Sequence, residues 1–163
     1  RAAFLVAVKC WDPPEPMVLL SVERRKGKTR LGLLGGKVKP EDGGDAWATA
    51  VRETKEETAE MFMSTLSQAQ HTRRAIGQGW SEQCKAQVFV TGVALDDGDV
   101  DTRWPEGFVV TEPGSTTEHL GLRWVERSKV LDSKWRNAEM HCHAAMVVSG
   151  VADVLAGLEV EMR

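Results

Sequence analysis

The chain has 163 residues, of which 42% are apolar, and this is enough material for one domain spanning residues 1–163. The formal net charge of −3 argues against a broad basic surface, so no DNA partner is expected. No apolar run approaches the roughly 18 residues of a membrane span, so no membrane partner is expected either.

The first half of the chain alternates between strand and loop patterns. Residues 2–10 and 18–25 are apolar segments separated by a proline-rich turn, which predicts a β-hairpin. A basic loop follows at 26–30, and then an extended segment that ends in a glycine turn. Residues 45–62 give the clearest helical pattern of the chain, with Asp45 as the N-cap.

The second half contains two further strand patterns and a closing helix. Residues 84–95 and 119–126 are predicted strands, and a long polar loop at 96–118 separates them. Loops of this length are often functional, although a mobile solvated insertion would look the same. Residues 137–160 predict the closing helix. This order of elements predicts an α/β protein, with a mixed sheet and helices packed on its faces.

Four glutamates lie within eight residues of the predicted helix 45–62. With about 100° per residue, Glu56, Glu57 and Glu60 fall at about −60°, +40° and −20° from Glu53, so all four share one face. We expect the neighbouring arc to be buried and the acidic face to stay free of the core. The residues of that arc are Trp47, Ala50, Val51, Thr54, Thr58, Met61 and Phe62.

A divalent cation would relieve the repulsion on this acidic face. Like charges three or four residues apart cost about 0.2–0.5 kcal/mol per pair on an isolated helix. Mg²⁺ prefers carboxylate oxygens and commonly shares its shell with substrate phosphates, which points to phosphate chemistry. The alternative is a solvated charged face that is balanced by Arg52, Lys55 and Lys37.

The segment from Gly35 to Glu60 resembles the Nudix hydrolase box, in which a glycine, five residues, a glutamate and seven residues precede R-E-apolar-x-E-E-x-G-apolar. Here the second half is R-E-T-K-E-E-T-A-E (52–60), behind the sequence GGKV (35–38). The segment RWVE (123–126) is similar to a late strand of the same family. The resemblance implies a Nudix-type α/β/α sandwich and a pyrophosphohydrolase that uses Mg²⁺ or Mn²⁺.

The box departs from the family pattern at several positions. Gly36 lies sixteen residues before Arg52, where the family has fourteen, so the first glutamate of the pattern falls on Gly44. Its substitutes are acidic residues nearby, namely Glu41, Asp42 or Asp45. Ala59 replaces the glycine that ends the family helix, and alanine allows the helix to continue.

The resemblance assigns roles to the matching residues. Glu53, Glu56 and Glu57 would hold the metal, with Glu56 or Glu57 polarising the water, and Arg52 would orient these carboxylates. Glu118, just before the RWVE segment, would supply an extra acidic ligand or base, unless it is a plain loop residue.

Substrate phosphates would meet the glycines and the basic residues around the box. Gly35 and Gly36 allow a close approach of the backbone to an anion, although glycines that only form a turn would look the same. Arg24, Arg25 and Lys37 are the candidate phosphate contacts, and a solubilising basic loop is the alternative. Trp80 or Trp104 could stack on a base, or simply pack. The consecutive His141, Cys142 and His143 point in different directions on a helix and do not predict a zinc site.

Two functions follow from this sequence. The first is a metal-dependent Nudix pyrophosphohydrolase that acts on a nucleotide or on the 5′ di- or triphosphate end of RNA. The second is a Nudix-fold module that binds a nucleotide or an RNA end with little turnover, inside a protein complex. The diverged box is similar to that of a mitochondrial messenger-stability factor of this superfamily, which implies RNA processing with protein partners.

The cellular location is predicted from the cysteines and from this resemblance. Cys10, Cys84 and Cys142 are odd in number and widely spaced, which favours reduced thiols in an intracellular compartment. The resemblance favours the mitochondrion over the cytoplasm. The apolar segment begins directly after Arg1, which leaves open whether a targeting peptide or another segment precedes it.

Overall fold

The computed structural model describes the whole chain except residues 11–14, 60–74, 93–103, 113 and 159–163. Its centre is a mixed sheet of eight strands. They are β1 (Ala2–Cys10), β2 (Pro16–Arg25), β3 (Lys28–Gly32), β4 (Leu34–Lys37), β5 (Gly77–Ser81), β6 (Ala86–Gly92), β7 (Val110–Thr111) and β8 (Glu118–Glu126). The order across the sheet is β5-β6-β1-β2-β8-β7, with β3 paired to β2 and β4 paired to β1.

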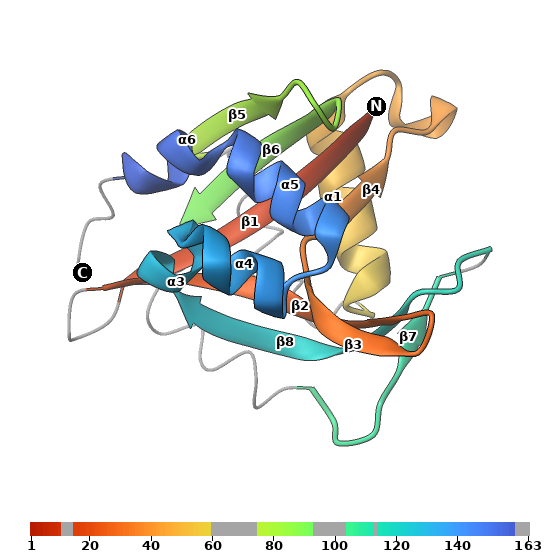
Figure 1. Ribbon diagram of the computed structural model, residues 1–163. Helices are drawn as coiled ribbons and strands as arrows, with labels where there is room; N and C mark the ends of the chain where they lie inside the picture. Colours follow the sequence, from red (N-terminus) through yellow and green to blue (C-terminus); the bar gives the residue numbers. More distant parts are fainter. Residues whose placement is uncertain (11–14, 60–74, 93–103, 113, 159–163) are drawn as a thin grey trace.

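Helices cover both faces of the sheet, as Figure 1 shows. Helix α1 (Ala46–Glu57) packs on one face, just after the short 3₁₀ helix η1 (Pro40–Asp42). The other face carries the C-terminal helices, which are α3 (Arg127–Leu131), α4 (Ser133–Glu139), α5 (Cys142–Gly150) and α6 (Ala152–Ala156). The predicted α/β class and the α/β/α sandwich are therefore confirmed.

Strand β1 shows why the first segment of the chain is apolar throughout. It lies between β2, which runs antiparallel to it, and β6, which runs parallel. Phe4, Val6 and Val8 pack toward the C-terminal helices, whereas Leu5 and Ala7 pack toward α1. A strand that is buried on both faces needs apolar residues at consecutive positions, rather than an alternation with polar ones.

The predicted hairpin of β1 and β2 is confirmed, with Val8 opposite Val18. The predicted basic loop 26–30 is wrong in part, because only Lys26 and Gly27 form the turn and Lys28–Gly32 is strand β3. The first side chains of β3 are exposed and polar, so the sequence gives no sign that the backbone of this segment pairs with β2. Strand β5 (Gly77–Ser81) is not among the predicted strands, because its two glycines do not give a strand pattern.

The predicted closing helix 137–160 is wrong as one element. The chain forms three short helices there, and it breaks at Met140, which adopts an extended conformation and bridges to Leu31 of β3. No helix among the described residues is long and apolar enough to cross a membrane.

A β-bulge in β8 shifts its register against β2. Val22 lies opposite Gly121, but the next residue, Glu23, lies opposite His119, so Leu120 is the extra residue. Because directly opposite residues of an antiparallel pair point to the same side of the sheet, His119 lies on the same side as Glu23.

Candidate functional site

The site is built around Arg52, whose guanidinium group joins η1 to helix α1. Its Nε donates a hydrogen bond to Asp42 Oδ1 at 2.8 Å, and its Nη2 donates to Asp42 Oδ2 at 3.0 Å. Asp42 also accepts from the Lys39 N–H at 2.9 Å and from the Thr49 hydroxyl at 2.7 Å. These hydrogen bonds, led by those from Arg52, hold the pKa of Asp42 well below its usual range.

These contacts distinguish among the three acidic residues near the missing box glutamate. Asp42 holds Arg52 through both carboxylate oxygens, whereas the carboxylate of Glu41 lies 3.8 Å from Arg52 Nε. Asp45 instead caps α1, where its side chain accepts from the Trp47 N–H, so the predicted N-cap is confirmed. Asp42 is therefore the acidic partner of Arg52.

Arg52 also contacts two box glutamates. Its Nη1 lies 3.0 Å from Glu53 Oε1 and 3.3 Å from Glu56 Oε2. Among the described residues, Glu53 and Glu56 come together with Glu112, their ligand atoms lying within 4.8 Å of one another. We call these three residues the open cluster, because Glu56 is exposed and Glu112 is only half-buried.

Glu112 was not predicted as a site residue. It follows β7 and belongs to the long polar segment 96–118. Its Oε1 is buried and has no hydrogen-bond partner among the described residues. Burial, together with the neighbouring Glu53 carboxyl group, raises the pKa of Glu112 to about 8. A lone acidic residue in a polar loop gives no sequence signal for this position.

The double glycine lies against the glutamates. The Gly35 N–H donates to Glu57 Oε1 at 2.8 Å. A Cβ at Gly36 would come within 2.6 Å of Glu53 Cδ, and one at Gly35 within 2.3 Å of the Ala3 carbonyl oxygen. Because these glycines have no side chain, carboxylates of α1 can lie directly against the backbone of β4.

The predicted free acidic face of α1 is wrong for two of its glutamates. Glu53 and Glu57 are both only 4% exposed, whereas Glu56 is exposed as expected. The predicted buried arc is confirmed for the residues Trp47, Ala50, Val51, Thr54 and Thr58. The covered arc is wider than the apolar residues indicate, because β4 lies over part of the acidic face.

Glu57 belongs to a second group, which we call the closed cluster, with Glu23 and His119. All three side chains are buried, and their ligand atoms lie within 4.8 Å of one another. His119 Nε2 lies 3.1 Å from Glu57 Oε2, and His119 Nδ1 lies 3.1 Å from the hydroxyl of Ser21. The three predicted metal ligands Glu53, Glu56 and Glu57 are therefore divided between two clusters.

Burial shifts the pKa values of the closed cluster toward the uncharged forms of its groups. It raises the pKa of Glu57 well above its usual range, helped by the Glu23 carboxylate, and it lowers the pKa of His119 to about 4. Burial also raises the pKa of Glu23, against the opposing effect of Arg25. The chain Ser21–His119–Glu57 has the connectivity of a hydrolytic triad, but Ser21 is fully buried and cannot meet a substrate.

The predicted phosphate contacts Arg24 and Arg25 both meet carboxylates of this chain. Arg24 forms an ion pair with Glu118, its register partner on β8. Arg25 Nη2 lies 2.7 Å from Glu23 Oε1. Lys37 is exposed, and its carbonyl oxygen accepts from Arg52 Nη2 at 3.3 Å.

Glu118 is not gathered with the box carboxylates in the described part of the chain. It is opposite Arg24, one position along β2 from Glu23, so it points to the side of the sheet away from His119. The loop glutamate that joins the box is Glu112 instead.

The end of α1 differs from the prediction. Helix α1 ends at Glu57, and Ala59 has a φ of 48°, in the left-handed region that favours glycine. Ala59 therefore adopts a left-handed conformation instead of continuing the helix. Glu60, Met61 and Phe62 lie outside the described residues.

The other candidates from the sequence, Trp80, Trp104 and residues 141–143, belong to neither the open nor the closed cluster. Trp80 Nε1 donates to Glu82, and Trp104 Nε1 donates to the Phe108 carbonyl group. The potential metal-binding groups among the described residues do not include His141, Cys142 or His143.

The open cluster fits the divalent cation that the sequence implies. Its three ligands offer only carboxylate oxygens, which is the chemistry that Mg²⁺ and Mn²⁺ favour over softer donor sets. The buried Oε1 of Glu112 has no partner among the described residues, and it is an acceptor that a cation would satisfy.

Comparison with known proteins agrees with this geometry. A model of the NUDIX domain family matches residues 3–144, and the chain therefore belongs to this family. No curated protein sequence matches the chain at a significant level.

Several solved structures share the fold. A Nudix hydrolase from M. smegmatis, RenU, is 14% identical with a TM-score of 0.54, and the match covers 99% of this chain and 89% of that one. A C. elegans Ap4A hydrolase in a binary complex is 19% identical with a TM-score of 0.51, covering 96% and 98%. Shewanella oneidensis NrtR, complexed with a 27mer DNA, is 12% identical with a TM-score of 0.51, covering 93% and 60%. The absence of a DNA partner therefore stays a prediction.

Proposed function

We propose that this protein is a metal-dependent pyrophosphohydrolase that cleaves a nucleoside diphosphate linked to another group. The observation that carries the proposal is the open cluster, in which Glu53, Glu56 and Glu112 converge while Arg52 holds two of them. Phosphoryl transfer depends on positioning and on neutralising charge, and this arrangement supplies both.

Each residue of the cluster has a defined task in this proposal. Glu53, Glu56 and Glu112 would hold Mg²⁺ or Mn²⁺, which would neutralise negative charge on the substrate phosphates. Arg52, anchored by Asp42, fixes the carboxylates in position. Water attacks one phosphorus atom of the pyrophosphate and gives up a proton to a carboxylate of the cluster. The bond to the bridging oxygen then breaks, and the leaving phosphate keeps the bonding electrons.

The substrate class follows from the surroundings of the cluster. Lys37 and Lys39 are exposed beside the box, and the charge of Lys39 acts on Glu112. Two lysines at the rim fit a substrate with several phosphates, such as a dinucleoside polyphosphate or the 5′ di- or triphosphate end of RNA. Arg24 and Arg25 would contact phosphates only by leaving Glu118 and Glu23, so we place them second to the lysines.

A substrate panel with matched variants tests this function. The purified chain is incubated with nucleoside triphosphates, a dinucleoside tetraphosphate and triphosphate-ended RNA, with Mg²⁺ or with EDTA. We expect Mg²⁺-dependent cleavage that falls at least about tenfold in Glu56→Gln, about 1.4 kcal/mol of barrier. Glu41→Gln removes a carboxylate that is 64% exposed and outside the cluster, so it should keep turnover. Cleavage that persists in EDTA, or falls equally in both variants, would overturn the proposal.

A second candidate is a binding module with little turnover, within a protein complex that acts on messenger RNA in the mitochondrion. It is favoured by the position of Glu57, which the Gly35 N–H and His119 hold in the closed cluster instead of the open one. This candidate predicts that phosphate-bearing ligands bind while the whole panel stays uncleaved. The same incubations, followed by calorimetry on the uncleaved ligands, separate the two functions.

A further inference from the structure

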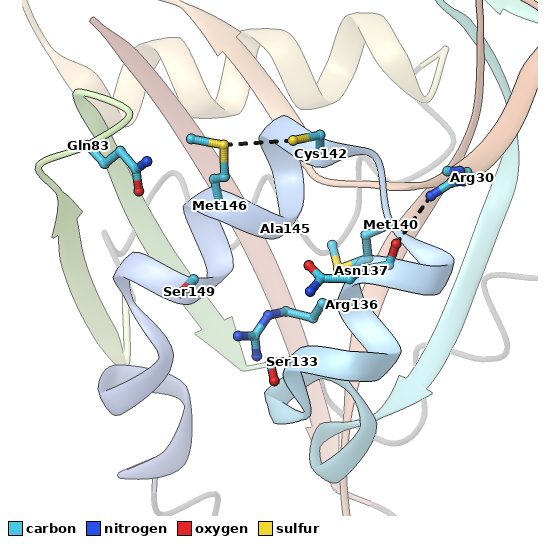
Figure 2. A pocket seen from close by; sticks show the side chains of 10 residues that line it. All are labelled: Arg30, Gln83, Ser133, Arg136, Asn137, Met140, Cys142, Ala145, Met146 and Ser149. Carbon is cyan, nitrogen blue, oxygen red and sulfur yellow. Dashed lines mark hydrogen bonds between the residues drawn. The ribbon is translucent and has the colours of Figure 1, made fainter.

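A cavity of about 300 Å³ lies on the face of the sheet opposite α1, between α4, α5 and the end of β5. Figure 2 shows Arg136, Ser133 and Asn137 of α4 on one side of it, with Met146 and Ser149 of α5 facing them. None of the described residues that line the cavity is acidic, although two of them are arginines.

Arg136 is the unusual residue of this cavity. Its side chain is only 7% exposed, and its one hydrogen bond to a described residue runs from Nη1 to the Val130 carbonyl oxygen at 3.0 Å. A guanidinium group has five N–H donors, so the Nε and Nη2 donors remain. None of these nitrogens is both fully covered and unpartnered among the described residues, and Arg136 lines the cavity.

Arg136 forms no salt bridge with a described carboxylate, and this separates it from the arginines of the acidic site. Arg52 is half-buried and pairs with Asp42, and Arg25 pairs with Glu23. A cation taken out of water without a counter-charge destabilises a protein, so a buried guanidinium group with no carboxylate partner among the described residues calls for an anion.

Arg30 adds a second positive charge to the cavity. Its Nη1 donates to the Asn137 carbonyl oxygen at 3.3 Å, and within the described ranges it also lacks a salt bridge. Two arginines thus line one cavity whose described lining holds no acidic residue, in a chain whose net charge is −3. This local excess is too small for a nucleic-acid surface, but it suits a compact ligand.

We propose that this cavity binds a small organic oxyanion, a phosphate monoester or a carboxylate on a compact skeleton. The remaining donors of Arg136 match two oxygens of such a group, and Arg30 adds charge at the other end of the cavity. Met140 and Met146 offer apolar surface to the skeleton, and Ser149 offers a hydroxyl group. The volume lies at the lower end of the range for small-molecule sites.

The test measures binding to the intact chain in EDTA, so that no metal supports a ligand at the acidic cluster. Ribose 5-phosphate, inorganic phosphate and succinate are titrated separately by calorimetry, while NMR follows the arginine Nε–H signals. We expect saturable binding of at least one probe, with a shift of the Arg136 signal. Ribose 5-phosphate binding more tightly than inorganic phosphate would show that the skeleton contributes, and succinate tests the carboxylate class.

Variants then assign the binding to the cavity. Arg136→Gln should raise the Kd at least about tenfold, and so should Ser149→Glu, which places a carboxylate at an exposed position of the lining. Ser149→Glu keeps the test decisive if Arg136→Gln does not fold. Lys134→Gln removes a charge from the same helix but outside the lining, so it should change the Kd less than about twofold.

Three results would overturn the proposal. They are no saturable binding of any probe, unchanged binding in Ser149→Glu, and an equal loss in Glu56→Gln, which would place the ligand at the acidic cluster. Because the measurement needs neither metal nor turnover, its outcome is independent of the hydrolase activity.

Discussion

The open and closed clusters take carboxylates from the same helix, yet they differ in almost every physical respect. Glu56 and Glu57 are neighbours in the sequence, but Glu56 is exposed beside Arg52, whereas Glu57 is buried between Gly35 and His119. Successive residues of a helix are about 100° apart, so the side chain of Glu56 points to solvent and that of Glu57 points to the backbone of β4. Identical residues of one motif therefore have unequal freedom to bind a cation, and the element packed over the helix sets that difference.

The largest expected difference between the two clusters is in Mn²⁺ affinity, when one carboxylate is removed from each cluster in turn. We expect Glu112→Gln to raise the Kd for Mn²⁺ about 100-fold, near 2.7 kcal/mol, because it removes the charge of a carboxylate whose buried Oε1 has no partner among the described residues. Glu57→Gln should change it less than about threefold, since Gln can still accept from the Gly35 N–H. Electron paramagnetic resonance of free Mn²⁺ measures both. Equal losses would mean that the metal draws Glu57 out of the closed cluster.

The next largest effect is expected on stability, when a side chain is added at Gly36 beside the open cluster. Gly36→Ala should lower the free energy of unfolding by about 2 kcal/mol, because its Cβ would lie 2.6 Å from Glu53 Cδ. In a Glu53→Ala background the same change should cost less than about 1 kcal/mol, since the obstructing side chain is gone. Urea denaturation of the four proteins measures the coupling. An undiminished cost in the double variant would place the strain in the backbone.

The ion pair that supports the open cluster should make stability depend on pH. Asp42 has a lowered pKa when folded, so its contribution is complete above the unfolded value of about 3.9 and is lost as the pH falls. Asp42→Asn should therefore lower the free energy of unfolding by about 2 kcal/mol at pH 7. This difference should shrink steadily below pH 4. Denaturation curves between pH 2.5 and 7 measure it, and a difference independent of pH would contradict the assignment.

The smallest effect concerns the end of α1, just after Glu57. Ala59→Gly should raise the free energy of unfolding by about 1 kcal/mol, because glycine adopts a φ of 48° without the steric cost that alanine bears. The change should leave Mn²⁺ affinity within about twofold, since Ala59 belongs to neither cluster. Thermal unfolding with and without Mn²⁺ measures both quantities. A lower melting temperature would show that Ala59 makes contacts that glycine loses.

Local features of the sequence were sufficient for much of the fold and for two of the three residues of the open cluster. The hairpin and the N-cap of α1 depend on residues close together in the chain, and so does the contact between Arg52 and Glu56 at i,i+4. Helical periodicity predicted the buried arc of α1 correctly. It gives the direction of each side chain, but not how much of the surface another strand will cover.

The missed residues come from distant parts of the chain. Glu112 reaches the box from a loop after β7, and Glu23 meets His119 only through the pairing of β2 with β8. Such juxtapositions depend on strand order and register, which alternation within one segment does not specify. The breaks in the closing helix were missed for a related reason, because Met140 leaves the helix to bridge β3.

The extra residue in β8 makes the chemistry of the closed cluster depend on strand register. Leu120 shifts the pairing by one position, so His119 faces Glu57 while Glu118 points to the opposite side. If β8 paired with β2 without the bulge, Leu120 would lie opposite Glu23, in the place of the imidazole, because side chains alternate between the faces of a sheet. An apolar group would then face Glu57 without any amino-acid replacement at the cluster. The register of this strand, as much as the identity of its residues, thus decides which side chain reaches Glu57.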